Sequence, residues 1–183
     1  MNRKQVLPEV KLSANLSALR AVDFCAAQTY LGTGFLPLKA LPRLDLELTN
    51  CGPDDGFEWH IQTQFTADAS GKPEQTLLLN LKGQVHLPCQ RCLQAFLFPF
   101  NEQALFLFVP NEAAADAYPI EDDRLEPLVA SQHFDLLGLI EDEILLSLPL
   151  VPKHPEGHCV PSHLLRGPDE PENPFKVLKN IKK

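Results

Sequence analysis

A pair of closely spaced cysteines is the most specific chemical feature of this sequence. Cys89 and Cys92 are separated by two residues, and the chain of 183 residues contains five cysteines. Zinc binds four nitrogen or sulfur ligands in a tetrahedron, and a Cys-x-x-Cys turn supplies two of them in suitable geometry. The turn is therefore a candidate for half of a zinc site. The alternative is that both cysteines are small packing residues that close a turn between two strands.

The other half of such a site would have to come from a distant segment. Cys159 and its neighbour His158 form a second concentration of cysteine and histidine, and His154 and His163 lie close by in the sequence. We take Cys159 as the candidate third metal ligand and His158 as the candidate fourth. Adjacent residues seldom bind the same ion, so the identity of the fourth ligand stays open.

Redox catalysis by the same pair fits its surroundings less well. A catalytic Cys-x-x-Cys has its first thiol at a helix N-terminus, where the helix dipole lowers the pKa of that thiol. Here Pro88 precedes the pair, and strand-like runs lie on both sides of it. The sequence also contains no Gly-x-Ser-x-Gly turn, phosphate-binding loop or His-Glu-x-x-His motif. We therefore expect a protein that binds rather than catalyses.

Basic residues that could contact RNA are few and local. The formal net charge of −8 argues against a surface that binds phosphate over its whole area. The candidate contacts to RNA or another partner are one arginine on the cysteine turn and four lysines at the C-terminus: Arg91, Lys176, Lys179, Lys182 and Lys183. Phe96, Phe98 and Phe100 could stack on bases, but their alternation predicts that they belong to the core.

The runs around the cysteine turn predict an antiparallel sheet. Apolar and polar residues alternate over 44–49, 57–65 and 76–86, which is typical of half-buried strands. After the turn, residues 93–109 predict two strands or one bent strand, and a short strand is expected near 125–129. Gly83 indicates a bulge or a close approach within its strand. The two glycines at 32 and 34 predict a turn.

Two helices are expected to cover this sheet. Apolar residues form one helical stripe near the N-terminus, after a capping residue at Asn15 or Ser17. Asp135 is a good N-cap for a second helix that reaches residue 148 and has a broad apolar face. Three consecutive acidic residues at 141–143 lie inside this helix, and we expect them to be mostly solvated.

Two further segments have other compositions. Residues 110–127 are rich in acidic residues and predict a solvated loop. Residues 166–183 form a proline-rich tail that ends in a short basic amphipathic helix beginning at Asn173 and Pro174. A helix this short cannot persist alone, since roughly 12–15 residues are needed in water. It must therefore dock on the body of the protein or fold on a partner.

These elements together predict the α+β class. We expect an antiparallel β-sheet over about 43–110, packed against an N-terminal helix and a helix near 135–148. A single domain would span 1–165, with the tail at 166–183. Residues 1–12 do not resemble a secretory signal, and no run approaches the roughly 18 apolar residues of a membrane span. A cytoplasmic location is expected, where cysteines are thiols or metal ligands rather than disulfides.

Five motifs occur in an order that resembles the YceD family, the bacterial family described as large ribosomal RNA subunit accumulation protein. The resemblance covers about residues 75–183. The motifs are Cys89-Gln90-Arg91-Cys92-Leu93 after a strand, Phe134-Asp135-Leu136-Leu137, the run from Glu141 to Pro149, His158-Cys159, and Asn173-Pro174-Phe175 with Leu178.

The resemblance implies a non-enzymatic ribosome biogenesis factor. Its role would be to support synthesis, processing or accumulation of the large-subunit (23S) ribosomal RNA. It would bind that RNA, a ribosomal protein or an assembly intermediate, and the acidity of the chain favours a basic ribosomal protein. The resemblance also implies metal binding at positions that match Cys89, Cys92 and Cys159. The alternative is a thiol-redox or metal-dependent RNA-processing enzyme that uses Cys89 and Cys92.

Overall fold

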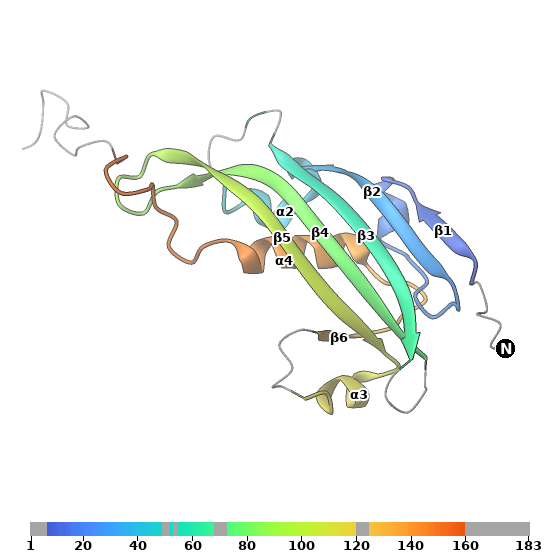
Figure 1. The fold of residues 1–183 in the computed structure, drawn as a ribbon. Coiled ribbons are helices and arrows are strands. Elements are labelled where there is room, and N and C mark those ends of the chain that lie inside the picture. Colours follow the sequence, from blue (N-terminus) through green and yellow to red (C-terminus); the bar gives the residue numbers. More distant parts are fainter. Residues whose placement is uncertain (1–6, 49–51, 53–54, 68–72, 120–124, 160–183) are drawn as a thin grey trace, which may run out of the picture.

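The computed structural model describes residues 7–48, 52, 55–67, 73–119 and 125–159. They contain a six-stranded sheet in the order β1-β2-β3-β4-β5-β6 (Figure 1). The strands are Glu9–Leu12 (β1), Thr29–Pro37 (β2), Gly56–Ala67 (β3), Pro73–Pro88 (β4), Ala95–Val109 (β5) and Glu126–Val129 (β6). Strands β2 to β5 are antiparallel, whereas the short edge strands β1 and β6 run parallel to β2 and β5. The predicted α+β class is confirmed, as a mostly antiparallel mixed sheet.

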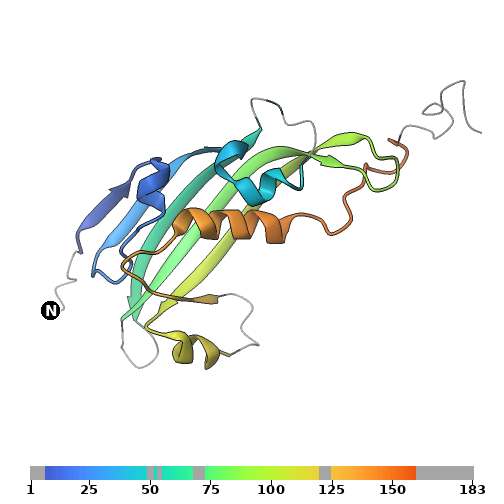
Figure 2. The same ribbon diagram turned by 180° about the vertical axis from the view of Figure 1, so that it is seen from behind.

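Helices pack against one face of this sheet, as the view from behind shows (Figure 2). On that face the strand residues Trp59, Ile61, Leu77 and Leu79 are buried. The alternating pattern therefore predicted β3 and β4 correctly, since every second side chain enters the core. Sequence alternation also predicted core positions on β5: Phe100 is buried, and the phenylalanines at 96 and 98 pack against the core.

The helices in the described residues are short. Their bounds are Leu16–Leu19 (α1), Leu38–Ala40 (the 3₁₀-helix η1), Pro42–Asp45 (α2), Glu112–Asp116 (α3) and Leu136–Ser147 (α4). The α4 helix begins as predicted, because the Asp135 side chain accepts a hydrogen bond from the Gly138 backbone N–H at 2.9 Å. None of these helices is long and apolar enough to cross a membrane.

The prediction of a turn at Gly32 and Gly34 was wrong, because both glycines lie inside β2. Strand β2 pairs with β3, and the ring of Trp59 lies over the two glycines. A Cβ atom would come within 2.8 Å of the Trp59 ring at Gly32 and within 2.9 Å at Gly34. Glycine is therefore needed here for the close approach of a large buried ring, and not for a turn. Gly83 on β4 confirms the predicted close approach, since a Cβ there would lie 2.2 Å from the Gly56 carbonyl oxygen.

The expected strand at 44–49 was also wrong. Residues 42–45 form α2, with Pro42 in its first turn, where proline is well tolerated. Leu44 is fully buried, whereas Leu46 is 84% exposed, so the two leucines do not share one face of a sheet. The predicted N-terminal helix is limited to α1, which is four residues long. The acidic segment 110–127 contains α3 and the start of β6, and its residues 120–124 lie outside the described part of the chain.

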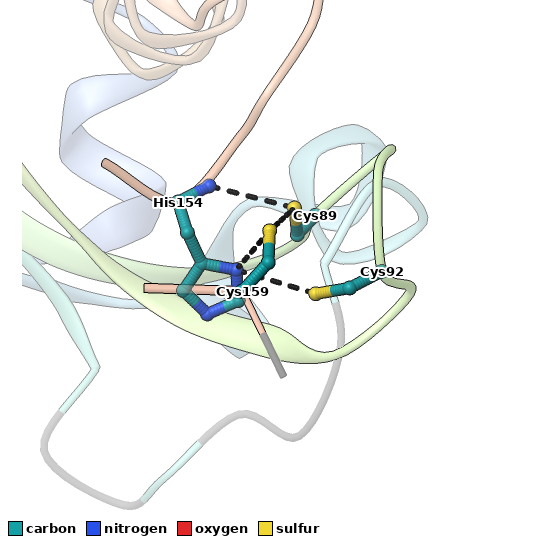
Figure 3. Close-up of side chains that lie close together, drawn as sticks. All are labelled: Cys89, Cys92, His154 and Cys159. Carbon is teal, nitrogen blue, oxygen red and sulfur yellow. Dashed lines mark hydrogen bonds between the residues drawn. The ribbon is translucent and has the colours of Figure 1, made fainter. Parts of the chain in front are cut away.

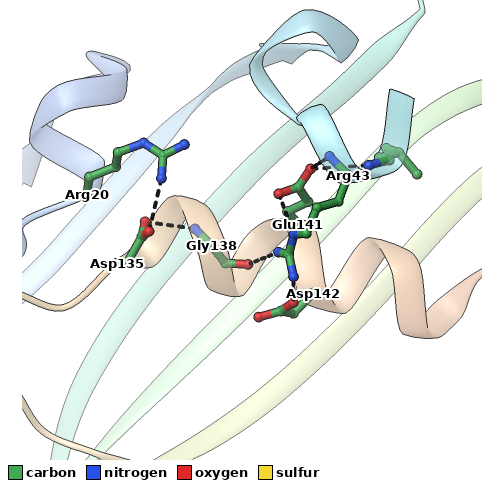
Figure 4. A network of polar contacts seen from close by, with 7 residues as sticks. Arg20, Arg43, Asp135, Gly138, Glu141 and Asp142 are labelled. Atoms are coloured by element: carbon green, nitrogen blue, oxygen red, sulfur yellow. Dashed lines mark hydrogen bonds and ion pairs between the residues drawn. The ribbon is translucent and has the colours of Figure 1, made fainter. Parts of the chain in front are cut away.

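A buried carboxylate joins α2 to α4 (Figure 4). Glu141 is 5% exposed, which corrects the expectation that it would be solvated. Its Oε1 accepts the backbone N–H groups of Arg43 and Leu44 at 2.7 and 3.2 Å, and its Oε2 pairs with the Arg43 guanidinium at 3.0 Å. Arg43 also contacts Asp142 at 2.6 Å. Hydrogen bonds to Asp142 and Glu141 raise the pKa of Arg43. Glu141 thus caps the first turn of α2 from a separate helix.

Candidate metal centre

The two cysteines at 89 and 92 lie on a tight turn between β4 and β5. The Cys89 backbone N–H donates to the Gln94 carbonyl at 3.0 Å, and the Leu93 N–H donates to the Cys89 carbonyl at 2.7 Å. Leu93 adopts a left-handed conformation with φ of 62°. The turn closes so tightly that both cysteines are buried while Leu93 is 80% exposed. The predicted strand–turn–strand arrangement is therefore confirmed.

A second segment returns to this turn after α4. The Gln90 backbone N–H donates to the Pro152 carbonyl at 2.9 Å, which holds the segment beside the turn. Farther on, the His158 N–H donates to the Pro155 carbonyl at 3.1 Å, and Gly157 has a φ of 80°. This is a β-turn with glycine at the position that requires a positive φ. It reverses the chain, so that the residues on either side of it, His154 and Cys159, approach each other.

Four side chains converge where the two segments meet (Figure 3). Cys89, Cys92, His154 and Cys159 each offer one ligand atom, and these atoms all lie within 4.8 Å of one another. The Cys89 and Cys159 sulfurs are 3.7 Å apart. The His154 Nδ1 atom lies 3.5 Å from the Cys92 sulfur and 3.8 Å from the Cys159 sulfur. We refer to these four residues as the Cys₃His cluster.

The spacing of the Cys₃His cluster fits a tetrahedral zinc ion. With zinc–sulfur and zinc–nitrogen distances of about 2.3 and 2.0–2.1 Å, the ligand atoms of a tetrahedron are separated by about 3.5–3.8 Å. The three separations given above, 3.5, 3.7 and 3.8 Å, fall in that range. Three cysteines and one histidine are also a common ligand set of structural zinc sites. The cluster could therefore hold a metal ion such as zinc.

The pKa values of the Cys89 and Cys159 thiols are shifted in opposite directions. Burial raises the pKa of Cys89, but N–H groups of His154, Arg91 and Cys92 stabilise its thiolate and lower the pKa to about 5. Burial raises the pKa of Cys159, and hydrogen bonds with the other two cysteines raise it further. The hydrogen bond from Arg91 lowers this pKa, but the net shift is upward. Crowded thiols resist ionising together, and a divalent cation at their centre would stabilise all of them as thiolates.

Arg91 turns toward the Cys₃His cluster. Its Nε–H donates to the Cys159 sulfur at 2.9 Å, and one terminal nitrogen lies 3.4 Å from the His154 carbonyl oxygen. The hydrogen bond to Cys159 raises the pKa of the Arg91 guanidinium. Three thiolates and a zinc ion would carry a net charge of −1, which this guanidinium can balance. Its predicted contact with RNA or another partner stays a prediction.

Replacing Arg91 by glutamine is expected to weaken zinc binding about tenfold, because residues that orient metal ligands contribute about 10–100-fold to affinity. Competition with a chromogenic chelator measures this. Gln90→Ala is the matched control, since Gln90 contacts the second segment through its backbone N–H. Equal affinities for the Arg91→Gln variant and the unsubstituted protein would contradict the assigned contact.

The histidine in the cluster is His154. In the sequence it lies close to Cys159, but His158 was the candidate fourth ligand. His158 lies inside the β-turn, is exposed, and has its Nδ1 3.0 Å from the Glu156 carbonyl oxygen. The Pro-Glu-Gly-His run could have indicated His154 instead of His158 from the sequence. A turn at this run brings its flanking residues together and directs its own residues outward. His163 and the lysines at 176, 179, 182 and 183 lie outside the described residues.

Sequence comparison finds a known family over a range that includes all four residues of the Cys₃His cluster. A family model described as "Large ribosomal RNA subunit accumulation protein YceD" matches residues 77–182. A curated Haemophilus influenzae protein with the same description is 32% identical over 164 residues, which cover 81% of this chain and 86% of that protein. No solved structure matches this chain.

Proposed function

The chain belongs to the YceD family of large ribosomal RNA subunit accumulation proteins, and from this we propose that it is a non-enzymatic factor in large-subunit biogenesis. Family membership implies a role in the accumulation of large-subunit ribosomal RNA. The finer proposal is that the protein acts in the cytoplasm and supports synthesis, processing or accumulation of 23S RNA. It would do so by binding that RNA, a ribosomal protein or an assembly intermediate. The family match over residues 77–182 carries this proposal.

We further propose that the Cys₃His cluster binds zinc as a structural ion. Cys89 and Cys92 would bind it from the β4–β5 turn, and His154 and Cys159 from the segment after α4. The ion would crosslink two segments that lie far apart in the sequence. In this way it would fix the surface formed by the turn and the end of α4.

The ligand count supports a structural rather than a catalytic ion. Catalytic zinc sites keep one coordination position open for water or substrate, whereas structural sites are filled by four protein ligands. Here four protein ligands are available within one cluster. The lowered pKa of Cys89 favours the alternative, a thiol-redox enzyme, because a thiolate is the nucleophilic form. Reversible oxidation of Cys89 and Cys92 to a disulfide, in purified protein that binds no metal, would support that alternative.

Capture from cell lysate tests the function. The full chain, carrying an affinity tag, is expected to enrich 23S RNA and large-subunit proteins over their small-subunit counterparts. Treating the lysate with RNase separates the two modes of binding: retained ribosomal proteins indicate protein contact, and their loss indicates RNA contact. Enrichment of neither class would overturn the proposed function. A Lys176/Lys179/Lys182/Lys183→Gln variant tests the contact predicted at the C-terminus, and unchanged capture by it would refute that contact.

A further inference from the structure

A groove opens between the end of α4 and the end of β4. It has a volume of about 340 Å³. Its walls come from the second residue after α2, from the end of β4 with the cysteine turn, and from the end of α4 with the segment after it. The lining residues are Glu47, Leu87, Pro88, Gln90, Leu145, Leu148, Pro149, Leu150 and Pro152. All but two of these side chains are apolar.

Leucines in the groove wall, and leucines next to wall residues in the sequence, are strongly exposed. Leu150 in its wall is 96% exposed. Leu46 and Leu146, which adjoin the wall residues Glu47 and Leu145 in sequence, are 84% and 77% exposed. Covering such a side chain removes apolar surface from water, which is favourable. An exposed apolar side chain in the wall of an apolar groove is typical of a surface that a partner covers.

The charge of the groove favours a basic occupant. Among the described residues that line it, Glu47 alone is charged. Asp45, two residues earlier, is also exposed. An amphipathic helix with an apolar stripe and lysines beside that stripe would match this surface, because the stripe fills the groove and the lysines lie near the carboxylates.

The chain itself contains such a segment at 174–183. Phe175, Leu178 and Ile181 recur at helical spacing, and lysines occupy positions 176, 179, 182 and 183. This segment lies outside the described residues. It begins a short distance along the chain from Cys159, the last described residue, which contacts the same cysteine turn that forms one wall of the groove.

The length of the connection permits docking within one chain. Residues 160–173 link Cys159 to the segment, and a chain of that length can span at most about 46–50 Å. A connection that can reach the groove makes docking an intramolecular step, which favours it over binding of a separate molecule. Even a helix that is too short to persist alone could then bind, since ordering and docking occur together.

We propose that residues 174–183 dock in this groove as a basic amphipathic helix. Phe175, Leu178 and Ile181 face the groove, and the lysines remain at the surface. Docking would create a basic surface on an acidic protein, next to the Cys₃His cluster. The docking involves this chain alone and does not depend on which ribosomal component the protein binds.

Photo-crosslinking of the purified full chain tests the docking. A benzophenone amino acid replaces Phe175, and mass spectrometry locates the crosslink. The expected product is a crosslink within one chain to residues 145–152, with a yield that does not change on dilution. Crosslinks between labelled and unlabelled copies would overturn the proposal in favour of a dimer. Crosslinks elsewhere on the chain, or none, would also overturn it.

A pair of substitutions makes the test specific. Leu150→Asp places a charge in the groove and is expected to lower the crosslink yield about tenfold, as a loss of about 1.4 kcal/mol would do. Leu150 is almost fully exposed, so this variant should fold normally. Leu97→Asp is the control, because Leu97 is 49% exposed on β5 and does not line the groove. Equal yields from the two variants would refute docking in this groove.

Discussion

Zinc is expected to be lost from the purified protein when either Cys89 or His154 is replaced, in the Cys89→Ser and His154→Ala variants. The unsubstituted chain should carry about one zinc ion, as a closed four-ligand site does. Removing one ligand from a site of this kind is expected to lower the affinity by more than the roughly 10–100-fold that loss of an outer partner costs, because the remaining three leave the ion partly solvated. Elemental analysis after dialysis measures the zinc content, and the thiolate absorption of the cobalt-substituted protein reports the number of sulfur ligands.

The two histidines provide a matched control for this prediction. His158→Ala should retain its zinc, because the His158 ring lies outside the cluster and contacts the Glu156 carbonyl oxygen. The sequence favoured His158 as the fourth ligand, so the pair of variants separates the two assignments. Loss of zinc in His158→Ala together with its retention in His154→Ala would contradict the cluster described above. A chain that binds no zinc before any substitution would remove the metal site from the proposal.

Replacing Glu141 by alanine is expected to lower the free energy of unfolding by about 2–3 kcal/mol. The substitution leaves the backbone N–H groups of Arg43 and Leu44 without their acceptor in a buried position. The Arg43 guanidinium is half exposed and finds water or Asp142, so its contribution to the loss is small. Urea denaturation gives the free energy, and the fluorescence of Trp59, the single tryptophan and 1% exposed, reports unfolding.

Two neighbouring substitutions define the cause of that loss. Glu141→Gln keeps one oxygen that can accept the two N–H groups, and should cost about 1 kcal/mol. Asp142→Ala removes the exposed pair with Arg43 from the same helix and should cost less than about 1 kcal/mol. If Asp142→Ala were as destabilising as Glu141→Ala, the stabilisation would come from the ion pairs and not from the capping of α2.

The sequence determined those elements whose side chains repeat with a clear period. Strands β3 and β4 were predicted because apolar and polar residues alternate over 57–65 and 76–86, and each strand buries one face. The α4 helix was predicted from the cap at Asp135 and a broad apolar face. Strand β2 was missed, because its glycines serve the ring of Trp59, a residue on another strand. Local pattern contains no information about such a neighbour.

The candidate metal centre was also determined partly by the sequence and partly by the tertiary structure. The spacing of Cys89 and Cys92 between two strands was enough to identify one half of it, since two ligands on one turn are set by local geometry. The choice of His154 depended on the β-turn at Pro155 and on the hydrogen bond from Gln90 to Pro152, which bring two distant segments together. The burial of Glu141 likewise depended on where α2 docks on α4. Ligand types and strand periods are properties of short stretches, whereas the fourth ligand and the buried carboxylate were decided by tertiary contacts between residues far apart in the chain.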